Sequence, residues 1–172
     1  MASDSSPQPI AASLHHQTSY WLDRLGSLVH DGLEKALAEY DVTLAQWSVL
    51  VTVYRGDARM PGDIARFINV DAGALTRLID RLAAKNLIRR CPAPGDKRSL
   101  HLELTPEAQV LVPKLARLAE ANEQAFFSAL TGREDQRLRK ILAKLLASRD
   151  VATPKKWRKP KPAKAEPETV SS

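Results

Sequence analysis

The chain has 172 residues, of which 44% are hydrophobic, and this is enough for one buried core in a single domain. The formal net charge of +6 favours a polyanionic partner. The sequence has neither an apolar run approaching the roughly 18 residues of a membrane span nor a signal peptide at its start, so we expect a cytoplasmic protein.

Positive charge is concentrated in two parts of the chain. Residues 149–172 hold seven Lys or Arg against three acids and are rich in proline, while Arg55 to Arg98 holds ten against five. The second segment predicts a basic module in the middle of the chain. Residues 1–12 and 149–172 have few apolar anchors, so both ends are predicted to be disordered. We interpret the basic tail as a solvated extension; the alternative is a source of non-specific attraction to phosphates.

Helical periodicity covers the first third of the chain. Apolar residues recur at helical spacing from Leu14 to Tyr40, over more turns than one small core needs, which suggests contact with a partner. Thr43 can cap a second helix from Leu44 to about Tyr54, which Gly56 ends.

The next two helices are predicted around residue 70. Pro61 suits the first turn of one helix, and Asp71 is a good cap for the other. One face of this fourth helix is apolar and the opposite face is polar. The apolar face holds Leu75, Leu78, Ile79 and Leu82, and the polar face holds Gly73, Thr76, Arg77 and Arg81. This is the pattern of a helix that reads DNA; the alternative is an ordinary amphipathic helix with a solvated charged face.

A hairpin and two further helices complete the pattern. Leu87 to Arg90 and Leu100 to Leu104 read as short strands. The loop between them, CPAPGDKRS, would project Lys97 and Arg98. Thr105 followed by Pro106 starts a fifth helix that extends toward Leu130, and Thr131 with Glu134 forms the capping box of a last helix.

Three segments in this order resemble the multiple-antibiotic-resistance regulator (MarR) family of winged-helix repressors. They are VTLAQWSVL in the second helix, VDAGALTRLIDRLAAKNLIRR in and after the fourth, and DKRSLHLELT in the hairpin. The resemblance covers about residues 14–148. It implies a mainly α fold with a small β-wing, in which a domain of residues 13–148 holds a winged helix-turn-helix at about 43–104 and dimerisation helices at about 13–41 and 105–148.

The resemblance implies a homodimeric repressor on a pseudo-palindromic operator, with two recognition helices in successive major grooves. By position, Gly73, Ala74, Thr76 and Arg77 are similar to the base-proximal stretch, and Asp96, Lys97 and Arg98 are similar to the wing tip. Arg77 is our choice for reading a guanine edge. Arg98 is expected to enter the minor groove or to pair with Asp96, and Arg81 to contact phosphate.

Family members usually sense aromatic acids or lipophilic phenols in a cleft beside the winged module. The effector residues that we expect from this resemblance are His15, His16, Ser19, Tyr20, Trp47 and Arg98. Trp47 could stack on an aromatic ring, or it could be a core residue without a ligand. The chain also resembles the branch that regulates nicotinic-acid degradation, whose effector is a hydroxylated pyridine carboxylate.

The sequence offers no motif for catalysis or metal binding. It lacks a paired nucleophile and base, a Gly-rich phosphate loop and paired catalytic carboxylates, so we expect no enzyme and no cofactor. The four histidines lack metal-site spacing. Cys91 is interpreted as a passive thiol, because the sensing cysteine of the family lies near the first helix. Two other functions stay open: a winged-helix module that binds protein, and a general DNA binder without an effector.

Overall fold

The computed structural model describes residues 17–93 and 96–149, with the backbone alone for residues 93 and 96–99. Its elements follow in the order α1 (Thr18–Ala38), α2 (Leu44–Arg55), α3 (Pro61–Ile68), α4 (Ala72–Ala84), β1 (Ile88–Ala93), β2 (Asp96–Leu104), α5 (Pro106–Phe126), the short 3₁₀ helix η2 (Phe127–Ala129) and α6 (Gly132–Ala147). The prediction of a mainly α fold with a small β-wing is confirmed.

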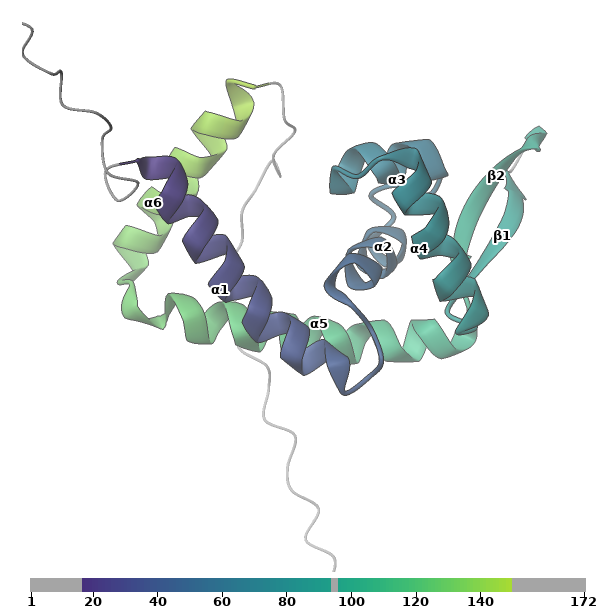
Figure 1. Cartoon of the computed structure of the whole chain (residues 1–172), viewed down its shortest axis with the longest axis horizontal. Coiled ribbons are helices and arrows are strands. Elements are labelled where there is room, and N and C mark those ends of the chain that lie inside the picture. The colour runs from purple at the N-terminus through teal and green to yellow at the C-terminus, as the bar shows by residue number, and fades with distance from the viewer. Residues whose placement is uncertain (1–16, 94–95, 150–172) are drawn as a thin grey trace, which may run out of the picture.

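The molecule has two parts that α5 connects. Figure 1 shows α2, α3, α4 and the β1–β2 hairpin together in one half, and α1 with α6 in the other. The long α5 runs along both halves and packs against α1 and α2. We call the half with α2, α3, α4 and the hairpin the winged module, and the half with α1 and α6 the helical arm.

Local sequence signals fix where the helices of the winged module begin and end. Thr43 and Gln46 form a reciprocal capping box at the start of α2, which satisfies two backbone donors that the helix leaves open. Gly56, with φ 73°, ends α2, and Asn69, with φ 55°, ends α3. Both residue types adopt this left-handed conformation readily. Two residues beyond Asn69, Asp71 starts α4.

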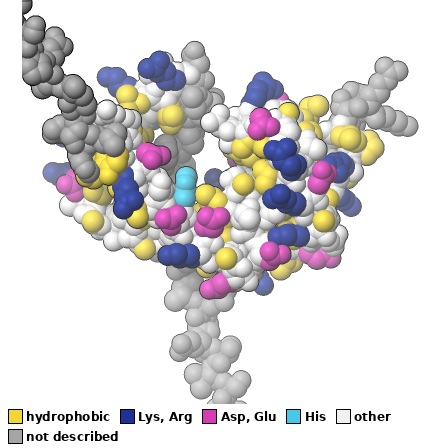
Figure 2. Space-filling model, viewed as in Figure 1, with side chains coloured by type: hydrophobic (Ala, Val, Ile, Leu, Met, Phe, Trp, Pro, Cys, Tyr) yellow, Lys and Arg dark blue, Asp and Glu magenta, His cyan; other side chains and the backbone are white. Residues whose placement is uncertain are grey.

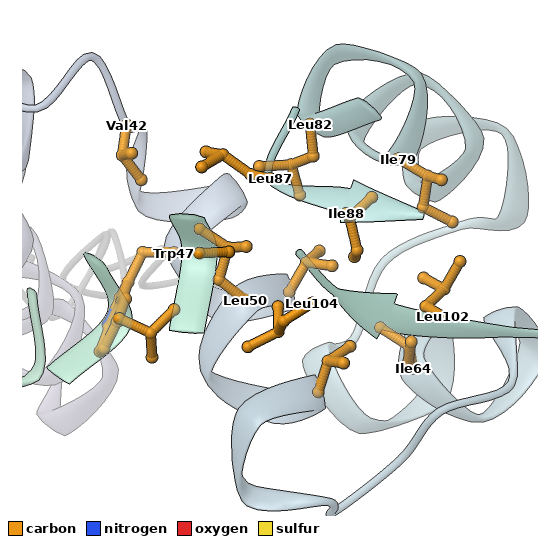
Figure 3. Packing of buried hydrophobic residues seen from close by; sticks show 14 of the residues in the cluster. Val42, Trp47, Leu50, Ile64, Ile79, Leu82, Leu87, Ile88, Leu102 and Leu104 are labelled. Carbon is orange, nitrogen blue, oxygen red and sulfur yellow. The ribbon is translucent and has the colours of Figure 1, made fainter. Parts of the chain in front are cut away.

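One hydrophobic core holds the winged module together. Leu50 of α2, Ile64 of α3, Leu82 of α4 and Leu102 of β2 are fully buried, and Figure 3 shows these side chains pointing toward one another. Burial of each such side chain contributes about 1.5–3 kcal/mol. The core extends to α1 and α5 through Leu37 and Leu115, so the packing sets the position of α4 relative to the hairpin and to the arm.

The hairpin is longer than the sequence indicated. The strands continue into the expected loop, with Ile88 opposite Leu104 at one end and Ala93 opposite Asp96 at the other, and the register shifts between Pro92 and Ala93. A proline is tolerated there because β1 is an outer strand with an irregularity beside it. On the other side of β2, the backbone N–H of Leu102 donates to the carbonyl of Arg59 at 2.9 Å.

The first helix is shorter than expected at its C-terminal end. It ends at Ala38, not at Tyr40, because Asp41 turns the chain with φ 53°. Leu14, His15 and His16 lie outside the described residues, as do the ends predicted to be disordered, apart from Arg149. Among residues 17–93 and 96–149, no helix combines the length and the apolar character needed to cross a bilayer.

Candidate nucleic-acid interface

The two faces of α4 differ as the sequence predicted. Leu75, Ile79 and Leu82 are buried against the core, whereas the outer face is open to solvent. This outer face holds Gly73, Thr76, Arg77 and Arg81, with Ala74 half-buried beside it. In Figure 2, several Lys and Arg side chains lie over the winged module, with Asp and Glu side chains among them. A rigid helix therefore presents guanidinium and hydroxyl groups outward, an arrangement that suits the edges of base pairs.

The N-terminal end of α4 carries a hydrogen-bonded cap. The side chain of Asp71 accepts a hydrogen bond from the backbone N–H of Ala74 at 2.8 Å. This bond, with smaller help from the charge of Arg77, holds the pKa of Asp71 below its usual range. The hydroxyl of Thr76 donates to the carbonyl of Ala72 at 2.9 Å, so its oxygen is left to accept from a partner.

The basic residues from α3 to β1 fall into two groups. Four have carboxylate partners, which reduce their attraction for phosphates: Arg66 with Asp63, Lys85 with Asp41, Arg89 with Glu103 and Arg90 with Asp80. Arg77 and Arg81 form no ion pair with another described residue and are exposed on α4. The unneutralised charge of α4 therefore lies on the face that points away from the core.

The wing lies next to α4 and is joined to it by an ion pair. Arg90 of β1 binds Asp80 of α4 at 2.5 Å, and the hairpin extends from this point to the edge of the molecule in Figure 1. Asp96, Lys97 and Arg98 form the first residues of β2 at the far end. Their side chains lie outside the described part, so their roles at the wing tip stay predictions.

A polar cluster at the base of the wing was not predicted. Glu103 accepts hydrogen bonds from Arg89 at 2.6 and 3.0 Å and lies 2.9 Å from Nε2 of His101. Hydrogen bonds from His101, then Arg89 and Cys91, lower the pKa of Glu103 to about 2. Burial, and then the hydrogen bond to Glu103, raises the pKa of the Cys91 thiol. A protonated thiol is a poor nucleophile, which agrees with the interpretation of Cys91 as passive.

The side chains of the cluster share one face of the hairpin because they alternate along both strands. Arg89 lies opposite Glu103, and Cys91 lies opposite His101. His101 is buried, and its Nδ1 has no hydrogen-bond partner among the described residues. Next to the cluster, a cavity of about 490 Å³ is lined by Val53, Tyr54, Arg59, Arg89, Glu103, Leu104 and Gln109. The alternation of polar residues was the available signal, but it identifies a cluster only once the strand register is known.

The expected effector residues are not brought together in one protomer. Ser19 and Tyr20 lie in the first turn of α1, at the end of the arm farthest from α2 (Figure 1). Trp47 is only 8% exposed and belongs to the core, where Figure 3 shows it beside Val42 and Leu50. The side chain of Arg98 and all of His15 and His16 lie outside the described residues. The effector roles of all these residues stay predictions.

A different set of residues forms a cavity between the arm and the winged module. It has a volume of about 370 Å³ and is lined by His30 of α1, Leu44, Ala45 and Ser48 of α2, and Ile68 and Val70 around the α3–α4 turn. The volume is within the range of small-molecule sites, and the lining is largely apolar with a few polar groups, as in such sites. Sequence reasoning missed this set because its members come from three separate segments.

Comparisons with known proteins agree with this geometry. The model of a family described as the MarR family matches residues 42–100. The multiple antibiotic resistance protein MarR of Salmonella typhimurium is 32% identical over 130 residues, which cover 73% of this chain and 90% of that protein. The regulator PecS of Dickeya dadantii is 28% identical over 127 residues, which cover 72% of this chain and 76% of PecS.

Solved structures give the same result. A mutant of MarR from E. coli in complex with operator DNA has a TM-score of 0.68 and 30% identity, with 74% of this chain and 92% of that chain covered. CouR from Rhodococcus jostii RHA1, solved with p-coumaroyl-CoA, has a TM-score of 0.71 at 21% identity, with 78% and 95% covered, so it supports the fold alone. The similarity to these proteins extends beyond the winged module to the flanking helices.

Proposed function

The chain belongs to the MarR family of transcription regulators that bind DNA, and on this premise we propose that it is a homodimeric repressor released from a palindromic operator by a small aromatic acid. Membership confirms the prediction of a regulator in place of an enzyme. The observation that carries the proposal is the outer face of α4. It presents Thr76, Arg77 and Arg81 to solvent, next to a hairpin whose second strand holds Lys97 and Arg98 after its first residue, Asp96.

The reading of DNA follows from the chemistry of this face. A guanidinium can donate two parallel hydrogen bonds to O6 and N7 of guanine, and such a contact discriminates against other bases by about 1–3 kcal/mol. We assign this role to Arg77, which lies one turn beyond Gly73 on α4. Arg81 lies a further turn from the N-terminal end of the helix and is assigned to phosphate, where it adds affinity without sequence preference. The wing residues Asp96, Lys97 and Arg98 are assigned to the adjacent minor groove or backbone.

Dimerisation is supported by an apolar surface on the helical arm. Four large apolar residues in the N-terminal part of α1 are about half exposed, with Trp21 at 50%, Leu22 at 45%, Leu25 at 47% and Leu28 at 46%. At the same end of the molecule (Figure 1), α6 exposes Ile141, Leu145 and Leu146. Soluble proteins rarely leave a contiguous surface of this kind uncovered. We propose that the arm of a second copy covers it, which would give two recognition helices related by a two-fold axis.

The effector is proposed to bind in the cavity between α1, α2 and the α3–α4 turn. Leu44, Ile68 and Val70 offer an apolar surface to an aromatic ring, and His30 and Ser48 offer polar contacts. The cavity lies between the arm and the winged module, so the affinity of a ligand that binds there depends on the angle between these two parts. A ligand that prefers one angle shifts the population of dimers away from the spacing that fits DNA. More narrowly, we propose that the effector is a hydroxylated pyridine carboxylate.

Selection of bound sequences from random duplex DNA tests the proposal. We expect enrichment of an inverted repeat with half-sites about 10–10.5 base pairs apart. Repeating the selection with benzoate or 6-hydroxynicotinate present is expected to abolish this enrichment, whereas the matching carboxamides are expected to have less effect. Recovery of random sequences without any acid would contradict operator recognition. An enriched repeat that no acid disturbs would leave recognition intact and contradict the effector.

A variant separates the effector site from the DNA site. Ala45 lines the cavity, and a leucine at this position fills part of it with a residue that favours helix. We expect Ala45→Leu to bind the selected operator as the unaltered protein does and to need several times more acid for release. If Ala45→Leu responds to the acid unchanged, the ligand binds elsewhere.

A further inference from the structure

We propose that the cavity at the base of the wing is a second small-molecule site, which takes an organic oxyanion: a carboxylate or a phosphate ester carried on an apolar or aromatic body. We call this space of about 490 Å³ the wing-base cavity. Its lining and that of the cavity beside His30 have no described residue in common. Binding there needs no DNA, so the inference does not depend on α4 reading an operator.

Four segments that are distant in the sequence converge on the wing-base cavity. Tyr54 comes from the last turn of α2, Arg59 from the connection to α3, and Gln109 from the first turn of α5. The hairpin contributes Arg89 and its cross-strand neighbour Glu103. Figure 1 shows the base of the hairpin beside the start of α5. The cavity therefore lies where the wing joins the rest of the winged module.

Arg59 supplies a guanidinium without an acidic partner. Its side chain is exposed and forms no ion pair or hydrogen bond with the residues that the structure describes. Its backbone carbonyl accepts from the N–H of Leu102 at 2.9 Å, which fixes this part of the connection against β2. An arginine keeps its charge at any physiological pH, and its planar fork matches two oxygens of a carboxylate or phosphate. Arg59 is thus a donor group that is available to an oxyanion.

The second guanidinium is oriented by hydrogen bonds that leave part of it free. Nε and Nη2 of Arg89 both donate to Oε2 of Glu103, at 3.0 and 2.6 Å. The other carboxylate oxygen, Oε1, lies 2.9 Å from Nε2 of His101. Nη1 of Arg89 has no acceptor within residues 17–93 and 96–149, so its two N–H groups can donate to a ligand. Glu103 therefore holds Arg89 in place without using all of its donors.

The charge and the shape of the lining favour an anion on an apolar body. Two guanidinium groups and one carboxylate give the lining a net positive charge, which an oxyanion balances. Val53 and Leu104 belong to the buried core and form an apolar floor. The ring of Tyr54 is about half exposed at the rim, where it can stack on an aromatic ring. The volume is within the range of small-molecule sites, so the cavity has room for more than the charged group.

Calorimetric titration of the full-length protein tests the inference with three probes: phenyl phosphate, benzoate and inorganic phosphate. The titrations are made at about 0.15 M chloride, where charges more than about 8 Å apart are largely screened. We expect saturable binding of phenyl phosphate, benzoate or both, and their relative affinities identify the preferred charged group. Inorganic phosphate should bind about tenfold more weakly than the preferred organic probe, because it lacks the body that contacts the apolar floor.

Arg59→Gln tests whether the probe binds in the wing-base cavity. The variant removes the guanidinium and keeps the backbone hydrogen bond to Leu102, so the fold should be unchanged. We expect it to weaken binding of the organic probe by about tenfold, because charge-assisted hydrogen bonds are lost. The matched control is Arg55→Gln, which removes the same charge from an exposed arginine of α2 that does not line the cavity. This control should change the affinity by less than about twofold.

A second control separates this site from the proposed effector site. Ala45→Leu narrows the cavity beside His30 and should leave binding in the wing-base cavity unchanged. If Ala45→Leu weakens binding of the probe while Arg59→Gln does not, the probe occupies the cavity beside His30. That result would overturn this inference and support the proposed effector site.

Three other results would overturn the inference. Equal losses in Arg59→Gln and Arg55→Gln would show a general attraction to positive charge. Inorganic phosphate that binds as tightly as the organic probes would show that the apolar floor has no role. The absence of saturable binding for all three probes would make the cavity an ordinary solvated depression. Failure of the proposed function is recognised separately, since the unaltered protein would then select no operator from random duplex DNA.

Discussion

The contact between α1 and α5 gives a prediction whose magnitude follows from the structure. The side-chain N–H of Asn122 in α5 donates to the carbonyl of Val29 in α1 at 3.0 Å. A Cβ added to Gly32 of α1 would overlap Oδ1 of the same amide. Gly32→Ala therefore requires Asn122 to move and to give up its hydrogen bond. The loss costs about 1 kcal/mol, while replacing glycine by alanine inside a helix contributes about 0.5–1 kcal/mol.

The two effects nearly cancel, so Gly32→Ala should change the free energy of unfolding by at most about 0.5 kcal/mol, toward lower stability. Asn122→Ala alone should cost about 1 kcal/mol for the same hydrogen bond. In the Asn122→Ala background the overlap is gone, and Gly32→Ala should stabilise by about 0.5–1 kcal/mol. The cycle thus predicts a coupling of about 1 kcal/mol between the two positions.

Urea unfolding at one fixed protomer concentration measures these differences, because the stability of a dimer depends on concentration. Gly26→Ala is the matched control, since nothing lies within 4 Å of a Cβ added to this glycine of the same helix. It should stabilise by about 0.5–1 kcal/mol. If Gly32→Ala stabilises the unaltered protein as much as Gly26→Ala does, the close approach of α1 and α5 is wrong.

Three further predictions concern the wing, the arm and the DNA surface. Because the pKa of Glu103 is lowered from 4.5 to about 2, its contribution to stability is complete above about pH 4.5 and is lost as the pH falls toward 2. Urea unfolding at pH 5 and pH 3 should therefore show a smaller loss of unfolding free energy between these pH values in Glu103→Gln than in the unaltered protein. Equal losses in the two proteins would contradict the assignment. Leu25→Lys places a charge in the apolar surface of α1, so sedimentation should detect monomers where the unaltered protein is dimeric; an unchanged dimer would place the interface elsewhere. Arg81→Ala should weaken binding to all duplexes alike and reduce the slope of log affinity against log salt by about one, whereas a changed sequence preference would refute a phosphate contact.

Signals that act over a few residues could be read from the sequence. Thr43, Asp71 and Thr131 each cap a helix at the expected position, because capping involves only a side chain and the next three backbone groups. The two faces of α4 were also predictable, since burial follows the helical period. The wing loop was predicted less well. Its prolines and glycine indicated a long loop, but the strands pair as far as Ala93 and Asp96.

Features made by distant segments could not be read in this way. Glu103 and Arg89 are 14 residues apart, and they meet only because the register places them opposite each other. The cavity beside His30 needs the packing of α1 against α2 and the α3–α4 turn, which no local pattern specifies. For Trp47 the sequence left a core role and a ligand role open, because a tryptophan on an apolar helix face suits both. Its burial now favours the core.

The central claim is that the outer face of α4 reads base edges through Arg77. Its most direct test is a comparison of the sequences selected from random duplex DNA by the unaltered protein and by Arg77→Ala. The claim predicts that both proteins still fold and dimerise, and that the variant loses its preference at one symmetric base pair in each half-site, with about 1–3 kcal/mol less discrimination there. The same preferred sequence at the same affinity for both proteins would contradict it.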